Sequence, residues 1–397
     1  MTDSPDFAML RTACVDKLAA TGCFDSAPWA REAVLRVARE QFVPSEIWVW
    51  VQGGGYRVLS REDDPQAWAE AVYDPVKAVV TQINDGEDQP SATITGSVRG
   101  AATSSVSALD IVCLKLGFLD LEREHRVLDV GAGSGVNTAL LEERTGPGNV
   151  VTIELDEDLA EQADHNLRAA GYMARVVCGN GEDGVAVDAP YDRLICTASA
   201  RHIPAAWLKQ VRPGGIILTP YGTHFSCSGL LKLTVGRDGS AEGRFVHTAS
   251  YMWLRSHREP GGRPPRVGEE RLSASPADPD KVLDGDWHAD FAIGHLVPGL
   301  TMRRLTGENG RGRLLLWDGA QSFASVCCDS WDEHDGVLQQ GPRSLWDEVV
   351  VARSWWEDHG RPQITRYGLT VTADGWHQVW LDTPQSPLPR SEACTAV

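Results

Sequence analysis

A glycine-rich turn between an apolar run and a predicted helix is the first candidate for chemistry. The run Val127–Val130 is followed by glycines at alternate positions, Gly131, Gly133 and Gly135. Glycine lets the backbone approach a ligand closely, and the N-terminus of the next helix offers N–H groups without partners inside the helix. The dinucleotide pattern G-x-G-x-x-G would need a small residue at Val136. The spacing G-x-G-x-G instead favours S-adenosylmethionine, which has no pyrophosphate, although the glycines alone also fit a structural turn.

Two later segments support a nucleoside ligand. Glu154 ends the next predicted strand about twenty residues on, where a carboxylate can accept two hydrogen bonds from a ribose diol. Gly179-Asn180-Gly181 ends the third predicted strand, where an adenine ring would lie. An exposed acid and a plain turn are the alternative interpretations of these two segments. The candidate cofactor contacts are Asp129, Gly131, Ala132, Gly133, Ser134, Gly135, Glu154, Asn180 and Gly181.

The elements that must position these residues alternate between strands and helices. The predicted strands are Val127–Val130, Val150–Glu154, Arg175–Cys178, Arg193–Cys196 and Gly215–Thr219. The predicted helices are Leu109–Leu121, Asn137–Thr145, Glu157–Ala170 and Ala205–Val211. Strands that alternate with helices of this length indicate an α/β fold with a parallel sheet covered on both faces.

The sequence on either side of this alternation has a different pattern. Before it, helical spacing over Asp6–Leu18 and Gly53-Gly54-Gly55 between strand-like runs predict an extension of helices and strands. After it, 255–280 is crowded with Pro, Gly, Ser and charge, which predicts a linker, and a tryptophan-rich segment follows. We expect an extension at 1–90, the α/β domain at 91–254, a linker at 255–280 and an α+β domain at 281–397.

The composition excludes several classes of protein. With 42% hydrophobic residues the chain is not disordered, and with 37 Lys+Arg against 55 Asp+Glu its net charge of −18 argues against a nucleic-acid partner. No apolar run approaches the ~18 residues that span a bilayer, and Met1–Phe7 has no basic cluster typical of a secretory signal. We therefore expect a cytoplasmic protein with no membrane partner. The sequence predicts no particular oligomeric state.

The cysteines do not form a pattern of metal ligands or disulfides. There are 9 of them, an odd number, and no CxxC pair occurs. Cys327-Cys328 precedes the acidic run Asp332–Asp335, but adjacent cysteines do not easily chelate one ion. A polar loop is the favoured interpretation there, and we expect reduced thiols and no metal site.

Six blocks of the sequence follow one another in an order and at spacings that resemble the protein-L-isoaspartate O-methyltransferase family. The blocks are Gly131–Gly135, Glu154, Gly179–Gly181, Ala189–Asp192, Thr197–Pro204 and Gln210–Gly215. Phe42-Val43-Pro44 also resembles this family. The resemblance implies a doubly wound class I S-adenosylmethionine methyltransferase sheet, S-adenosylmethionine as cofactor, S-adenosylhomocysteine as its product, and a peptide carboxylate as acceptor. The family has an acid where this chain has Asn180, so the contact beside adenine differs.

A second departure concerns the acceptor side. The family has a hydroxyl in a Ser-x-Pro segment before the first helix, and the corresponding stretch here, 102–107, has no proline. The resemblance therefore leaves Thr103, Ser104 and Ser105 as candidates for orienting the acceptor oxygen. Capping a helix that begins near Val106 is the alternative role for the same side chains.

A third departure is the length of the chain beyond residue 225. The extended form, with Val80-Thr81-Gln82 early and 375–382 late, is similar to homologues that accompany ribosomal-peptide biosynthesis in actinobacteria. That resemblance implies an O-methyltransferase whose partner is a modified precursor peptide (lanthipeptide, graspetide or lasso peptide) and whose ester product closes to an aspartimide or forms isoaspartate. The alternatives are repair of isoaspartyl residues in damaged proteins, a small-molecule acid as acceptor, and a binding module without catalysis.

Overall fold

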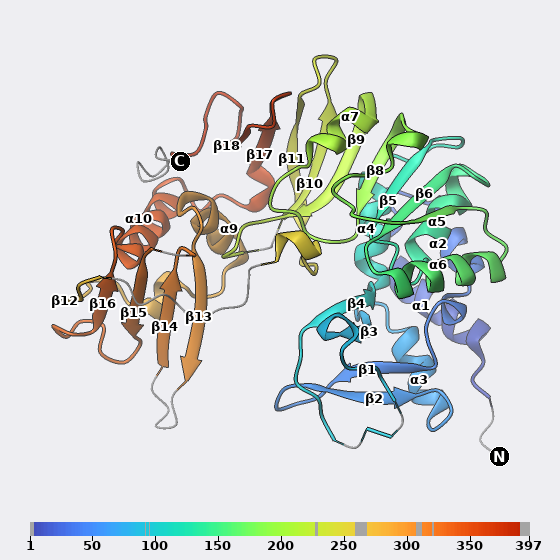
Figure 1. The fold of residues 1–397 in the computed structure, drawn as a ribbon, viewed down its shortest axis with the longest axis horizontal. Coiled ribbons are helices and arrows are strands. Elements are labelled where there is room, and N and C mark those ends of the chain that lie inside the picture. The colour runs from blue at the N-terminus through green and yellow to red at the C-terminus, as the bar shows by residue number, and fades with distance from the viewer. Residues whose placement is uncertain are drawn as a thin grey trace. The chain divides into compact units, whose positions relative to one another are not determined.

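The chain forms two compact units. The computed structural model describes residues 4–91, 93–94, 96–226, 229–258, 268–306, 312–319 and 321–389. The first unit comprises residues 1–198, 204–218 and 234–239, and the second comprises 199–203, 219–233 and 240–397 (Figure 1). Within the described part of the chain, no helix has both the length and the apolar character to cross a bilayer.

The first unit begins with helices and a small antiparallel sheet of strand order β2-β1-β3-β4. The expected helix at Asp6–Leu18 is α1, whose N-cap Asp6 accepts a hydrogen bond from the Met9 N–H, and the expected strand pair around Gly53–Gly55 is β1 and β2. The elements are α1 (Phe7–Ala20), α2 (Trp29–Arg36), η1 (Arg39–Gln41), β1 (Glu46–Trp50), β2 (Tyr56–Ser60), α3 (Pro65–Val72), β3 (Val79–Ile83), η2 (Asn84–Gly86) and β4 (Ala102–Val106).

The rest of the first unit is the expected α/β fold. Its strands have the order β9-β8-β5-β6-β7 and pair in parallel. The elements are α4 (Leu109–Phe118), β5 (Val127–Val130), α5 (Val136–Thr145), β6 (Val150–Glu154), α6 (Glu157–Ala169), β7 (Arg175–Cys178), η3 (Ala186–Asp188), β8 (Tyr191–Cys196), α7 (Ala205–Gln210) and β9 (Val211–Tyr221). This arrangement confirms the expected doubly wound parallel sheet.

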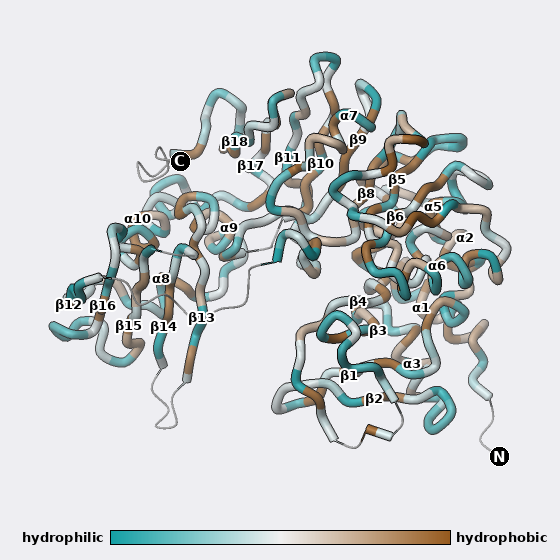
Figure 2. Tube along the Cα trace, in the orientation of Figure 1, coloured by the Kyte–Doolittle hydropathy of each residue, from teal (hydrophilic) through white to brown (hydrophobic). Residues whose placement is uncertain are grey.

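The strand order places a topological switch point beside β5. The chain moves outward from β5 to β6 and β7, and then returns to place β8 on the other side of β5. All four residues of β5 are buried, and Figure 2 shows this part of the sheet as hydrophobic. In open α/β sheets ligands bind outside the carboxyl ends of the strands at such a point. The segments that follow β5 and the strands beside it are therefore the place to look for a site.

The second unit is an α+β body. It contains the strands β11, β17 and β18, which pair antiparallel in the order β11-β17-β18 with β10 next to β11, and the five-stranded antiparallel sheet β12-β16-β15-β14-β13. The elements are β10 (Gly229–Val235), β11 (Ala241–Thr248), η4 (Arg255–His257), β12 (Arg271–Ser273), α8 (Pro279–Val282), α9 (Trp287–Leu296), β13 (Thr301–Thr306), β14 (Gly312–Trp317), β15 (Phe323–Cys327), β16 (Val337–Gln340), α10 (Leu345–Asp358), η5 (Ile364–Arg366), β17 (Tyr367–Val371) and β18 (His377–Leu381).

One segment expected to be irregular contains regular structure. The stretch 255–280, predicted as a linker, includes η4 and β12, and β12 pairs antiparallel with β16 through Arg271 and Gln339. Residues 259–267 of that stretch lie outside the described residues. A short strand in a polar, proline-rich segment has no local signal, because its partner follows more than sixty residues later in the chain.

Candidate functional site

The glycine turn after β5 has the backbone shape that only glycine adopts without strain. Gly131, Gly133 and Gly135 all have positive φ, at 92°, 52° and 94°. A Cβ at Gly131 would lie 2.6 Å from Thr197 Oγ1, and that hydroxyl donates to the carbonyls of Val130 (3.1 Å) and Gly131 (2.6 Å). Hydrogen bonds from Thr197 therefore hold the turn to the end of β8. Because its glycines have no side chains, a ligand could approach the backbone of the turn closely.

The other two residues of the turn contribute through the backbone. Ala132 is buried, and the Ser134 carbonyl accepts a hydrogen bond from Asn166 Nδ2 at 3.0 Å, which holds the turn to α6. Gly135 is the left-handed N-cap of α5, and a Cβ there would lie 3.1 Å from Leu167 Cγ.

Asp129 on β5 is completely buried and is bonded to the first turn of α5, the helix that follows the glycine turn. Its carboxylate accepts hydrogen bonds from Asn137 Nδ2 (2.9 Å) and Thr138 Oγ1 (2.7 Å), both in the first turn of α5, and from Thr152 Oγ1 on β6 (3.5 Å). Burial raises the pKa of Asp129 to about 6, although these donors favour the ionised form. Since protein donors occupy its carboxylate oxygens, Asp129 holds the start of α5 and β6 against the turn.

Glu154, at the end of β6, points its carboxylate at the turn. Its Oε2 accepts a hydrogen bond from the Gly133 N–H at 3.0 Å, and its Oε1 accepts from the N–H groups of Leu155 (2.9 Å) and Asp156 (3.2 Å). Asp156 in turn is the N-cap of α6. Since a carboxylate oxygen can accept more than one hydrogen bond, Glu154 is held in orientation and keeps acceptor capacity for a diol.

The third segment, after β7, is also fixed by its own contacts. Asn180 Oδ1 accepts from the Glu182 N–H at 3.1 Å, which closes a short side-chain turn. The carbonyl of Gly181 accepts a hydrogen bond from the buried indole Nε1 of Trp207 on α7 at 2.8 Å. The structure therefore brings the segments after β5, β6 and β7 to one edge of the sheet, and they fit a nucleoside-type cofactor: a bare turn, a carboxylate and a second turn.

The candidate acceptor hydroxyls lie on a strand. Thr103, Ser104 and Ser105 belong to β4, and α4 begins only at Leu109 with Ala108 as an N-cap that makes no side-chain bond. The interpretation of these residues as helix caps is therefore wrong. Instead, Ser105 and Ser104 pair with Val80 and Gln82 of β3, which lies about twenty residues earlier.

Ser104 is the hydroxyl nearest the glycine turn. A Cβ built at Gly133 would lie 3.9 Å from Ser104 Oγ and 3.8 Å from the Ser105 carbonyl. Ser104 is buried, and its Oγ accepts a hydrogen bond from Thr81 Oγ1 on β3 at 3.1 Å. Thr103 Oγ1 instead donates to Gln82 Oε1 at 2.9 Å. The geometry thus separates the three candidates, with the Ser104 hydroxyl beside the glycine turn.

Sequence reasoning missed a buried lysine in the same unit. Lys115 on α4 is 2% exposed and donates from Nζ to the Cys196 carbonyl at the end of β8, at 2.8 Å. Burial lowers the pKa of Lys115 to about 8, while the nearby Asp129 carboxylate opposes that shift. A single lysine inside the apolar run of Leu109–Leu121 was the available signal.

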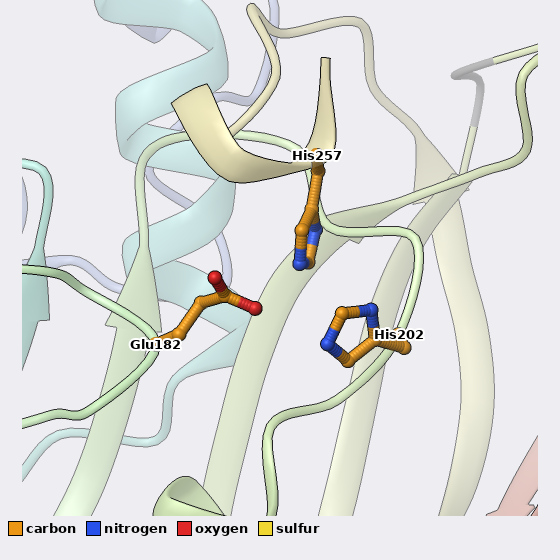
Figure 3. A group of neighbouring side chains, drawn as sticks. All are labelled: Glu182, His202 and His257. Carbon is orange, nitrogen blue, oxygen red and sulfur yellow. The ribbon is translucent and has the colours of Figure 1, made fainter. Parts of the chain in front are cut away.

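In the second unit, the segment that follows β8 is held by histidines. His257 in η4 is buried, and its Nδ1 accepts a hydrogen bond from the Arg201 N–H at 3.0 Å, while the ring centroids of His202 and His257 are 4.2 Å apart. Figure 3 shows these two rings and also labels Glu182 of the first unit. His377 Nε2 accepts from the Ile203 N–H at 2.9 Å, and burial, reinforced by His202, lowers the pKa of His377 to about 4.

The segment weighed as a metal site has the character of a loop. Asp332, Glu333, His334 and Asp335 are all exposed, and Cys328 is buried. Cys327 Sγ accepts a hydrogen bond from Arg313 at 3.1 Å.

Comparisons with known proteins agree with the geometry. The family model described as protein-L-isoaspartate(D-aspartate) O-methyltransferase (PCMT) matches residues 88–259. A protein-L-isoaspartate O-methyltransferase of Hyperthermus butylicus is 32% identical over 262 residues, which make up 64% of this chain and 91% of that protein. One of Ignicoccus hospitalis is 34% identical over 191 residues, or 48% of this chain and 71% of that protein.

A solved structure named protein-L-isoaspartate O-methyltransferase resembles nearly the whole chain. It matches 94% of this chain and 100% of its own length, with a TM-score of 0.50 and 17% identity. At that identity the likeness supports the fold alone.

Proposed function

Because the chain belongs to the protein-L-isoaspartate(D-aspartate) O-methyltransferase family and is an S-adenosylmethionine-dependent carboxylate O-methyltransferase, we propose that it methylates the free carboxylate of isoaspartyl residues in peptides and proteins. The observation that carries the proposal is the position of Ser104 Oγ beside the glycine turn, where an acceptor oxygen would meet the methyl donor.

The chemistry needs positioning more than acid or base catalysis. A carboxylate with a reference pKa of about 3.9 is already ionised at pH 7, so no residue must remove a proton. When bound, S-adenosylmethionine supplies an electrophilic methyl group, which passes to the carboxylate oxygen as the carbon–sulfur bond breaks, leaving the ester and S-adenosylhomocysteine. The chain must hold the oxygen in line with that bond.

The described residues divide this task between two groups. The glycine turn, Glu154 and the Gly179–Gly181 turn would hold the nucleoside and amino-acid parts of the cofactor. Ser104 would donate a hydrogen bond to one acceptor oxygen and leave the other oxygen to attack, while Thr81 keeps the Ser104 hydroxyl oriented. Asp129 and Lys115 would stabilise the ends of β5 and β8, from which the turn projects.

The product ester has a defined fate. A methyl ester is a better acyl electrophile than a carboxylate, so the backbone nitrogen of the next residue can attack it and expel methanol. The resulting five-membered imide forms without further contribution from the protein.

An aspartate in a modified ribosomal peptide is the second candidate acceptor. The five-stranded sheet β12–β16 favours it, because this sheet lies beyond residue 259, where the family model ends, and offers additional surface for a folded peptide. Length alone does not separate the two candidates, since the solved structure of the same family name matches 94% of this chain.

The test compares three acceptors with the full chain and S-adenosylmethionine. They are an isoaspartyl peptide, its normal aspartyl isomer, and a cyclic precursor peptide that contains Asp. Mass spectrometry would follow addition of one methyl group and later loss of methanol. We expect turnover of the isoaspartyl peptide and not of its isomer. Turnover of the cyclic peptide alone would overturn the proposal in favour of the second candidate, and binding of S-adenosylmethionine without any peptide turnover would overturn both.

A further inference from the structure

The acceptor strand and the cofactor carboxylate are joined by a chain of side-chain hydrogen bonds. Thr103 Oγ1 on β4 donates to Gln82 Oε1 at 2.9 Å, and Gln82 Nε2 donates to Asp156 Oδ2 at 3.3 Å. The Asp156 N–H donates to Glu154 Oε1 at 3.2 Å, and the Gly133 N–H donates to Glu154 Oε2. One amide thus links a hydroxyl of the small sheet to the carboxylate at the edge of the parallel sheet.

Gln82 is built into this position. The residue is buried, at 6% exposure, and the pairing of β3 with β4 is irregular on both sides of it, between Val80 and Gln82 and between Gln82 and Ile83. The turn that follows β3 closes around the amide, because a Cβ at Gly86 would lie 3.1 Å from Gln82 Nε2. The Asp85 N–H donates to Thr103 Oγ1 at 3.0 Å, which leaves that hydroxyl proton for Gln82.

The hydrogen bonds between Thr103 and Asp156 require an amide at position 82. The Gln82 oxygen accepts a hydrogen bond from the Thr103 hydroxyl, and its NH2 group donates one to the Asp156 carboxylate, so a single planar group makes both bonds. A hydrogen bond to a charged partner is worth more than one between neutral groups. β3 and β4 belong to the separate four-stranded sheet, so the bond from Gln82 to Asp156 ties that sheet to the edge of the parallel sheet.

We propose that Gln82 is a positioning residue that couples the acceptor strand β4 to the cofactor carboxylate Glu154 through Asp156. Binding of the cofactor at Glu154 then fixes Asp156 and Gln82, and through Thr103 it fixes the strand that carries Ser104. The inference rests on the proposed function for the roles of Ser104 and Glu154, but its central test uses cofactor binding alone.

The first test is the pair Gln82→Met and Gln82→Glu in the full chain. Methionine has the length of glutamine and makes neither bond, so we expect about tenfold weaker binding of S-adenosylmethionine by calorimetry, at every pH. Glutamate at pH 8 places a second carboxylate beside Asp156 and should weaken binding as much. On acidification to about pH 5.5 the crowded carboxyl introduced by Q82E takes up a proton and can donate as the amide did. Relative to the native chain at the same pH, Q82E should therefore recover while Q82M does not.

Two further variants separate the link from general damage to the small sheet. Thr81→Val removes the Thr81–Ser104 bond on the same two strands but leaves the Gln82 link intact, so cofactor affinity should stay within about twofold of the native value. The double variant Q82E/D156N restores a donor opposite an acceptor, and Asn also serves as an N-cap, so it should recover affinity at pH 8.

With a peptide that the protein methylates, Q82M should also lower kcat about tenfold. If Gln82 only stabilised the fold, the substitution would instead lower the fraction of folded protein and leave the kcat of the folded protein unchanged. Equal weakening by Q82E and Q82M at all pH values, or weakening by T81V to the same extent, would overturn the proposal. If no peptide acceptor is turned over, the proposed function fails by itself, and the pH dependence of cofactor binding still decides the role of Gln82.

Discussion

Two buried titratable groups, Asp129 in the parallel sheet of the first unit and His295 among the aromatic rings of the second unit, differ in their hydrogen bonding. Asp129 is fully buried among donors, with Asn137, Thr138 and Thr152 bonded to its carboxylate. His295 on α9 is packed against Phe291, with ring centroids 4.5 Å apart, and its buried Nε2 has no hydrogen-bond partner within the described residues. The first arrangement fixes a backbone in place, whereas the second fills space.

The difference predicts opposite responses to mild acid. Burial raises the pKa of Asp129 from 3.8 to about 6, so the folded protein binds a proton at this carboxyl more readily than the unfolded chain does. Asp129 therefore adds to the stability of the fold at low pH, and this contribution is lost as the pH rises through about 6. Burial lowers the pKa of His295 to about 4 from 6.5, so it adds stability above pH 6.5 that is lost as the pH falls through about 4.

Breaking the glycine turn should have the largest effect. In Gly131→Ala the new Cβ would meet Thr197 Oγ1 at 2.6 Å and the residue would keep a φ of 92°, so we expect roughly hundredfold weaker binding of S-adenosylmethionine by calorimetry. Gly171→Ala is the matched control, because Gly171 has a similar φ of 86° with nothing within 4 Å of its Cβ. Equal loss in both variants would mean that backbone strain alone matters at Gly131.

Removing the charge at Glu154 should come next. In Glu154→Gln one acceptor oxygen becomes a donor, so either the bond from Gly133 or the bonds from Leu155 and Asp156 are lost. Loss of charge-assisted bonds predicts about thirtyfold weaker S-adenosylmethionine binding with little change in melting temperature. Unchanged affinity in the calorimeter would remove Glu154 from the cofactor site.

A smaller effect is expected at the acceptor hydroxyl. Ser104→Ala should lower kcat/KM for the peptide about tenfold and leave S-adenosylmethionine affinity unchanged, because the hydroxyl is expected to contact the acceptor. Ser105→Ala is the control on the neighbouring residue of β4. Initial rates at saturating cofactor would measure both, and a larger loss in S105A than in S104A would contradict the assignment.

The smallest expected effect is on acid unfolding, when His295 in the second unit is replaced. His295→Phe keeps the aromatic packing and removes the group that gains a proton on unfolding, so acid unfolding should move to lower pH by about half a unit. Circular dichroism between pH 7 and pH 3 would show it. A shift in the other direction would mean that His295 is charged in the folded protein.

The part of the site that the sequence predicts is local. Val127–Val130, the glycine turn and Glu154 are each contiguous with the strand that presents them, so spacing alone reports their geometry. The parallel sheet is predictable for the same reason, because each strand and helix carries its own periodicity.

What sequence reasoning missed depends on partners far along the chain. The residues of β4 have the composition of a helix cap, and only pairing with β3 makes them a strand. The carbonyl that accepts from Lys115 belongs to Cys196, and β12 exists because β16 lies beside it. Neither periodicity nor a short motif contains that information.

The indole of Trp207 provides an optical signal beside the Gly179–Gly181 turn, the proposed adenine side of the site. It is fully buried and donates its N–H to the Gly181 carbonyl, so movement of that turn changes the polarity around the ring. The emission of this one tryptophan, isolated as the difference between the native chain and W207F, should shift when the third turn closes on a nucleoside. Where the Gly179–Gly181 turn holds the nucleoside as proposed, Trp207 emission would report cofactor binding without an added dye or turnover.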